Sequence, residues 1–193
     1  MRLIVALGAL LVACAGTGSL LVSRSGQTDI GSSSPFPVGD VFKNTEWTRV
    51  EAALSRRGLG NATVVSGDRL QRNGRPFALV RATSRARGIC FLPVRGTRPG
   101  PATCTADGHL ASPLLVFGAR DDWGGNRATF VVGVVRNSVV GVSMVDSRGY
   151  ESGVALLPGP GGLWSFAGGY GSANLVVRAR LASGRIVAER RVG

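Results

Sequence analysis

The chain has 193 residues, the size of one domain with room for a leader and a linker. Its formal net charge is +12, but Lys43 is the only lysine. Such an arginine bias is what a GC-rich genome imposes on codon choice, so it weakens any inference from charge to nucleic acid. The arginines are spread along the chain without a long block of like charges, which excludes an obvious disordered basic arm. The 29 glycines favour a β protein with many turns over a helical bundle.

The leader, residues 1–26, begins with Arg2 and an apolar run, and three interpretations of it stay open. Its segment Leu11-Val12-Ala13-Cys14 resembles a bacterial lipobox, in which cleavage leaves Cys14 as a lipidated N-terminus. The same region fits the small-residue cleavage site of an ordinary secretory signal, and the apolar run is also long enough for an uncleaved membrane anchor. All three place the rest of the chain outside the cytoplasm. We therefore expect an extracytoplasmic protein of the cell envelope, attached to the membrane through its N-terminus.

Residues 27–43 are a predicted linker. Three consecutive serines, Ser32 to Ser34, precede Pro35 and Pro37, and this composition favours extended backbone and cannot pack a core. The single folded domain is then expected to span residues 44–193.

The first element of that domain is a predicted helix. Asn44 or Thr45 can cap its start, and the apolar stripe of the helix includes Val50 and Leu54 at helical spacing. Gly58 follows at the position where a helix end needs left-handed backbone. We expect this short helix to cover one side of a sheet.

From Ala62 onward the pattern is that of β-strands. Asn73-Gly74 is the strongest hairpin signal, because both central positions of such a turn favour positive φ. Residues 84–88 form a further predicted turn. Strands are predicted around these turns and towards the C-terminus, within residues 77–80, 89–94, 113–117, 163–167, 175–181 and 185–192.

The segment from Thr129 to Leu157 reads as three consecutive antiparallel strands. In the first, Phe130, Val132 and Val134 share one face, and the residues between them share the other, because side chains alternate along a strand. Both faces are apolar, which predicts a sandwich interior or a covered sheet. In total, about ten strands joined by short turns predict an all-β fold. This is an antiparallel β-sandwich or a partly open barrel, with one short N-terminal covering helix.

Three segments carry a resemblance to known proteins. They are GVVRNSVVGVSMVDSRGYESGVALLPGPGGLWSF, GRPFALVRA with ICFLPV, and the closing LVVRARLASGRIVAERRV. The first two resemble an uncharacterised family of extracytoplasmic β-rich proteins of actinobacteria and their relatives. The third is similar to the closing hairpin of bacterial immunoglobulin-like modules, although the Cys…Trp…Cys hallmark of true immunoglobulin domains is absent. The resemblance implies an envelope protein and no known reaction.

The cysteines are Cys14, Cys90 and Cys104. If Cys14 is lipidated or removed, the other two make an even pair in an oxidising compartment, and we predict a disulfide between them. Such a bond stabilises by about 3 kcal/mol in the chain-entropy model. Two cysteines and one histidine are too few for a structural zinc site without carboxylates, so no metal is predicted.

His109 is the only histidine and follows a predicted turn at Asp107-Gly108. The chain has no G-x-S-x-G elbow to present a serine, and Asp107 is too close in sequence to be assumed the partner of a catalytic histidine. We interpret His109 as a residue of a surface or disulfide loop.

Asp121 and Asp122 are the only adjacent carboxylates. With Asn126 they offer the oxygen ligands that calcium favours, but the spacing of a calcium loop is not met, and Arg120 and Arg127 flank them. We interpret this segment as a loop salt-bridged to its arginines.

The sequence therefore predicts a membrane-tethered, non-enzymatic domain with a binding or structural role at the cell envelope, without a cofactor and without specific nucleic-acid binding. A second hypothesis is an electrostatic binder of anionic envelope polymers or lipid headgroups. A third is a hydrolase that uses Asp121 and Asp122 or His109.

Overall fold

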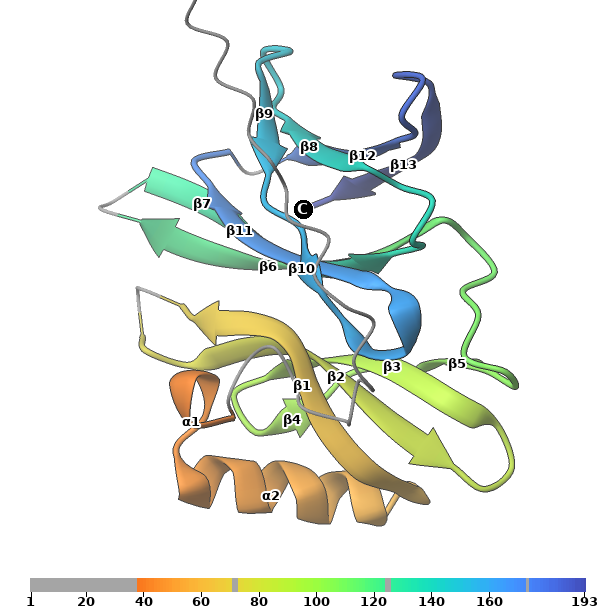
Figure 1. The fold of residues 1–193 in the computed structure, drawn as a ribbon. Helices are drawn as coiled ribbons and strands as arrows, with labels where there is room; N and C mark the ends of the chain where they lie inside the picture. Colours follow the sequence, from red (N-terminus) through yellow and green to blue (C-terminus); the bar gives the residue numbers. More distant parts are fainter. Residues whose placement is uncertain (1–37, 71–72, 124–125, 173) are drawn as a thin grey trace, which may run out of the picture. The chain divides into compact units, whose positions relative to one another are not determined.

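The computed structural model describes residues 38–70, 73–123, 126–172 and 174–193, all of which belong to one compact unit. Two helices and three antiparallel sheets lie in successive layers, with the helices on the outer face of the first sheet (Figure 1). In the part of the chain that is described, each sheet is open rather than closed into a barrel. The prediction of an antiparallel β-sandwich with a covering helix is therefore confirmed, with three sheets in the stack.

The chain completes the helices and sheet A first and then alternates twice between sheet B and sheet C. Helices α1 and α2 span Val38–Val41 and Asn44–Ser55. The first sheet, sheet A, contains β1 to β5, which span Leu59–Arg69, Pro76–Ser84, Gly88–Arg95, Arg98–Pro99 and Thr103–Thr105. The middle sheet, sheet B, has the order β10-β11-β7-β6, with bounds Leu157–Pro158, Trp164–Tyr170, Asn126–Val135 and Leu114–Trp123. The last sheet, sheet C, has the order β13-β12-β8-β9, with bounds Ile186–Val192, Leu175–Arg180, Gly141–Val145 and Glu151–Val154. A 3-10 turn at Pro160–Gly162 joins β10 to β11.

The helices are held on sheet A by an apolar layer. Val50 and Leu54 of α2 are buried against the helix-facing side chains of β2 and β3, as the predicted stripe requires. The cap is one residue earlier than predicted, because the backbone N–H of Lys43 donates to the Glu46 carboxylate. The prediction for the end of the helix is confirmed, since Gly58 has a φ of +71°.

The N-terminal boundary of the packed residues differs from the prediction. Val41 and Phe42, which the sequence analysis assigned to the linker, are fully buried in the layer between the helices and sheet A. These two adjacent apolar residues follow Pro37 closely, and the single turn of α1 directs them into the core. Residues 27–37 of the predicted linker lie outside the described residues.

Sheet B is buried on both faces. On β7, Val132 and Val134 face sheet A, and Val131 and Val135 face sheet C, so the predicted alternation is confirmed. The prediction that 129–157 forms three consecutive strands of one sheet is wrong. Strand β7 pairs with β6 and β11, whereas β8 and β9 pair with each other in sheet C. Both faces of β7 are apolar and buried because this strand lies between two other sheets. The polar residues that follow β7 therefore lead the chain into sheet C instead of closing a hairpin.

The hairpin between β1 and β2 is present but is not the predicted two-residue turn. Gly74 has a φ of +58°, while among the described residues other than glycine only Asn61 has a positive φ. Instead, the Asn73 side chain accepts a hydrogen bond from the Arg75 N–H at 2.9 Å, an Asx turn that does not need left-handed backbone.

Candidate anion-binding site

A hollow of about 960 Å3, open to solvent, lies at one end of sheet A. It is near the upper end of the size range of small-molecule sites. Its lining is Ser55, Arg57, Gly58, Leu59, Gly60, Asn61, Thr83, Ser84, Arg85, Ala86, Arg87, Ala102 and Cys104. We call this surface the arginine hollow. Among these described lining residues three are arginines and none is acidic, so they give the hollow a local positive charge.

Strand pairing brings the arginines of the hollow together from distant parts of the sequence. Leu59 at the start of β1 pairs with Ser84 at the end of β2, so the end of α2 lies beside the loop that joins β2 to β3. Arg57 belongs to the first segment, and Arg85 and Arg87 belong to the second. The juxtaposition is therefore a consequence of sheet register.

The loop that carries Arg85 and Arg87 is a tight one. Ser84 pairs with Gly88 across it, and Gly88 has a φ of +75°, the left-handed conformation that three-residue hairpin loops require. A Cβ at Gly88 would lie 2.4 Å from the Thr105 carbonyl oxygen, so glycine also allows the loop to approach β5. Both arginine side chains are exposed at this tip, where an external anion can reach them.

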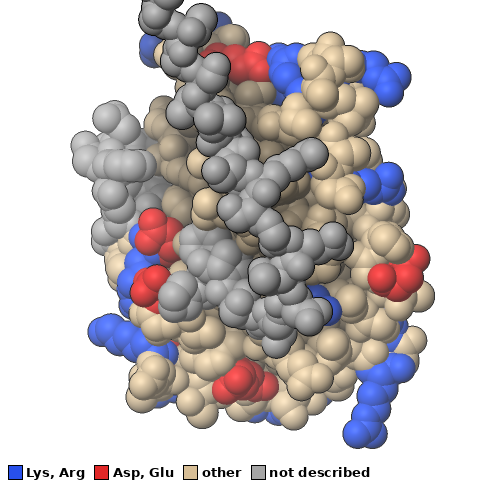
Figure 2. Space-filling model, viewed as in Figure 1, with Lys and Arg blue, Asp and Glu red and all other residues tan. Residues whose placement is uncertain are grey.

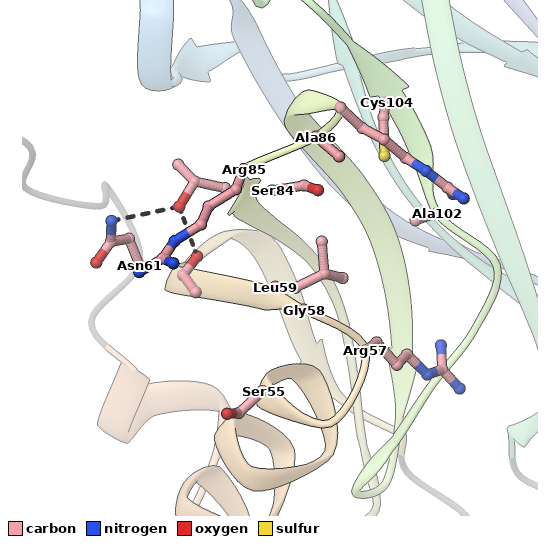
Figure 3. Close-up of a pocket in the computed structure, with 13 residues that line it drawn as sticks. Ser55, Arg57, Gly58, Leu59, Asn61, Ser84, Arg85, Ala86, Ala102 and Cys104 are labelled. Atoms are coloured by element: carbon pink, nitrogen blue, oxygen red, sulfur yellow. Dashed lines mark hydrogen bonds between the residues drawn. The ribbon is translucent and has the colours of Figure 1, made fainter.

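Arg57 is exposed and also makes a hydrogen bond within the protein. Its Nη1 donates to the carbonyl oxygen of Gly100 at 2.8 Å, which ties the end of α2 to the segment before β5. A guanidinium group carries several N–H donors, so Arg57 can keep this bond and still bind an anion. In Figure 3, Arg57 leaves the end of α2 on one side of the hollow, and Arg85 extends toward Asn61 on the other.

The wall beside Arg85 contains an irregular part of β1. The pairing of β1 with β2 shifts register between Gly60 and Thr63, a β-bulge, and Asn61 within it has a φ of +47°. Asn61 Nδ2 donates to Thr83 Oγ1 at 3.3 Å, and that hydroxyl donates to the Gly60 carbonyl at 3.1 Å (Figure 3). These bonds fix the polar edge of the hollow.

The opposite wall is fixed by the disulfide. Cys90 of β3 and Cys104 of β5 are directly paired across the strands and are bonded, so this prediction is confirmed. Cys90 is fully buried in the layer under the helices, while Cys104 is partly exposed and lines the hollow. The bond therefore anchors the rim of the hollow to the core of sheet A.

Two arginines of sheet C, at the opposite end of the molecule, have acidic partners. On the outer face of sheet C, Arg178 lies 2.8 Å from Glu189, and Arg180 lies 2.8 Å from Glu151. Hydrogen bonds from the Ser143 hydroxyl and from Arg180 hold the pKa of Glu151 below its ordinary value. On the face shown in Figure 2, red and blue side chains lie next to one another along the top and along the left edge. The arginines of the hollow differ from these two, because its described lining residues include no carboxylate.

The residues predicted as alternatives for catalysis are not brought into one site. His109 is exposed in the connection that leads to the first residue of β6, and its backbone N–H, not its ring, donates to Asp107 at 3.0 Å. That bond holds the pKa of Asp107 below its ordinary value. The backbone of Asp121 lies near the other end of β6, about 20 Å from the first residue of that extended strand.

Asp121 and Asp122 also differ from the prediction in their local structure. Both residues were predicted to lie in a loop, but their backbone continues β6 and pairs with Ala128 and Arg127 of β7. Their side chains lie outside the described part of the molecule, as does residue Cys14. Among the residues that are described, no group of His, Cys, Asp and Glu could hold a metal ion.

Sequence reasoning missed the arginine hollow, although the chain contains a signal for it. No acidic residue occurs between Asp68 and Asp107, and the arginines in this interval are Arg69, Arg72, Arg75, Arg81, Arg85, Arg87, Arg95 and Arg98. This uneven charge distribution marks sheet A as the basic part of the chain. The contribution of Arg57 could not be found this way, because it depends on the pairing of β1 with β2.

No helix in the described ranges is long and apolar enough to cross a membrane. Comparison of the chain with known protein families, with curated proteins and with solved structures found no match.

Proposed function

We propose that this protein is a non-catalytic binding domain that holds anionic groups in the arginine hollow. The observation that carries the proposal is the composition of the lining, in which Arg57, Arg85 and Arg87 occur and the residues that the structure describes include no carboxylate. Guanidinium groups bind phosphate, sulfate and carboxylate oxygens through charge-assisted hydrogen bonds. Ser55, Ser84 and Asn61 add polar groups around them.

Salt-dependent elution from a sulfated polysaccharide such as heparin tests the proposal. The site variant is Arg85→Gln/Arg87→Gln, and the matched control is Arg148→Gln/Arg185→Gln, which removes the same charge from exposed residues of two other turns. We expect the site variant to elute at clearly lower salt than the control, because a local site and not the net charge sets the affinity. Equal elution of the two variants would overturn the proposal. Thermal melts of both variants verify that they are folded.

We further propose that the domain is tethered to the membrane at the cell envelope through its N-terminus, with Cys14 as the lipidated residue. The support is the lipobox-like spacing Leu11-Val12-Ala13-Cys14 after an apolar run. The test is fractionation of cells that express Cys14→Ser, together with the intact mass of the wild-type protein extracted from membranes. A diacylglyceryl adduct on the wild type and release of the variant are expected. Unchanged membrane retention and unchanged mass would contradict the lipid anchor.

A further inference from the structure

The cations of the arginine hollow are arranged around it instead of converging on one point. Arg57 and Arg85 lie on different sides of the hollow (Figure 3). Arg85 and Arg87 belong to one loop, but the residue between them separates their side chains along the backbone. A single small anion can therefore contact only part of this charge.

A single exposed contact of this kind contributes little. An ion pair between exposed groups in water is worth about 0–1 kcal/mol, because both partners are well hydrated and screened by salt. Binding becomes appreciable when several anionic groups are linked in one molecule, since each contact after the first forms at a high effective concentration. The geometry of the hollow thus favours a ligand with repeated charges.

The rest of the lining narrows the ligand class. Within the described lining no residue is aromatic, so these residues offer no platform on which a nucleobase could stack. Leu59 is the one large aliphatic residue in this described set and is buried, so the set presents no exposed large apolar side chain for insertion into a bilayer. Tyr150 and Ile186, which are exposed, belong to sheet C and its turns.

We propose that the ligand of the arginine hollow is a linear polyanion with repeated anionic groups, held by Arg57, Arg85 and Arg87 at separate points along its length. This inference rests on the proposed function and specifies its ligand. With a flexible polyphosphate as the probe, three neutralised phosphates predict that log K falls with log salt concentration with a slope of about −2, since each contact contributes about −0.7.

Binding of linear polyphosphates of increasing length to the full chain tests this inference. Orthophosphate, tripolyphosphate and a long polyphosphate are titrated at equal phosphate concentration and at several salt concentrations. We expect the long chain to bind at least about tenfold more tightly than tripolyphosphate. The variant Arg57→Gln/Arg85→Gln/Arg87→Gln is expected to lose this advantage. The matched control Arg120→Gln/Arg148→Gln/Arg185→Gln, which changes exposed arginines elsewhere, is expected to keep it.

The remaining outcomes separate the two proposals. If orthophosphate binds as tightly as the polymer and only the site variant loses it, the polymer inference is wrong while anion binding in the hollow stands. If the site variant and the control lose equal affinity, or if no anion binds, the proposed function itself is wrong. If anionic phosphatidylglycerol vesicles bind the wild type more tightly than the site variant and long polyphosphate does not reduce this difference, the occupant is a membrane surface and the polymer inference is overturned.

Discussion

Glu46 and Arg69 join the start of α2 to the end of β1 through a two-pronged ion pair. Arg69 Nη1 lies 2.8 Å from Glu46 Oε2, and its Nη2 lies 3.1 Å from Oε1. Arg69 also donates to the Val41 carbonyl at 3.0 Å, so one guanidinium holds both helices on sheet A. The hydrogen bond from Arg69, followed by that from the Lys43 backbone, holds the pKa of Glu46 below its ordinary value.

A lowered carboxyl pKa stabilises the folded state above the ordinary glutamate pKa of about 4.3, and this contribution is lost as the pH falls through the folded-state pKa. We predict that Glu46→Gln lowers the free energy of unfolding by about 1 kcal/mol at pH 7. The difference from wild type should shrink towards zero in acid. Urea unfolding between pH 7 and pH 3 measures it, with Glu51→Gln, an exposed glutamate of the same helix, as the control. A deficit that persisted unchanged at pH 3 would contradict this account.

Gly133 in β7 allows an aromatic ring to lie directly on the backbone of sheet B. A Cβ at this position would lie 2.3 Å from Cζ of Phe166 and 2.7 Å from the Leu115 carbonyl oxygen. Phe166 is fully buried in the apolar cluster between sheets B and C, so its ring can give way only by displacing packed neighbours.

We predict that Gly133→Ala lowers the free energy of unfolding by about 1–3 kcal/mol, the usual cost of overpacking a core. The control is Gly141→Ala in β8, where a Cβ would meet nothing within 4 Å, so a neutral or slightly stabilising effect is expected. Thermal melts of both variants provide the comparison. Equal stability of the two variants would show that Phe166 can move aside.

At the scale of elements, β5 depends on one neighbour and one covalent bond. It spans three residues, Thr103–Thr105, and pairs only with β3 among the described strands. The Cys90–Cys104 bond closes the stretch that contains β4 and a proline-rich segment with little means of ordering itself. The arginine hollow therefore has one wall whose position depends on the disulfide.

We predict that Cys90→Ala/Cys104→Ala lowers the melting temperature, with a loss of up to about 3 kcal/mol, less to the extent that the prolines already restrict the loop. Anion binding should weaken in the same variant, because the Ala102–Cys104 wall is released. Peptide mapping without reductant and thermal melts of the double variant test the structural role. An unchanged melting temperature combined with a complete loss of binding would instead assign the bond to the site alone.

The elements themselves were predictable to different degrees. The faces of β7 and the glycine end of α2 follow from local spacing, which is why they were found correctly. The path of the chain after β7 was not predictable, because a polar break after a strand has the same sequence pattern whether it closes a hairpin or crosses to another sheet. Arg136 shows the difference, since its guanidinium donates to the Leu110 and Ala111 carbonyls of a distant connection. That bond anchors the crossing and has no local sequence signal.

At the scale of the whole molecule, the sequence predicts a sandwich but not the number or order of its layers. Strands with two apolar faces indicate a buried sheet without saying what covers each side. The arginine hollow has the same origin, because Arg57 and Arg85 come to line one hollow only through the register of β1 and β2. Contacts set by register between distant segments leave no local pattern, which is why the candidate site was missed while the disulfide, inferred from cysteine arithmetic, was found.

The central position of β7 has a consequence for hydrogen exchange. This strand is paired on both edges, and sheets A and C cover its two faces, so its amides can meet deuterium only when the whole fold opens. Peptides that cover 126–135 are therefore expected to exchange last in the wild-type protein. Their exchange should be faster in Gly133→Ala than in the wild type. A polyanion bound in the hollow should slow it about tenfold for each 1.4 kcal/mol that binding adds to the free energy of unfolding. A strand that touches no ligand would then report the occupancy of the hollow by mass spectrometry. Exchange in β7 that ignored both the variant and the ligand would show that this sheet opens by itself.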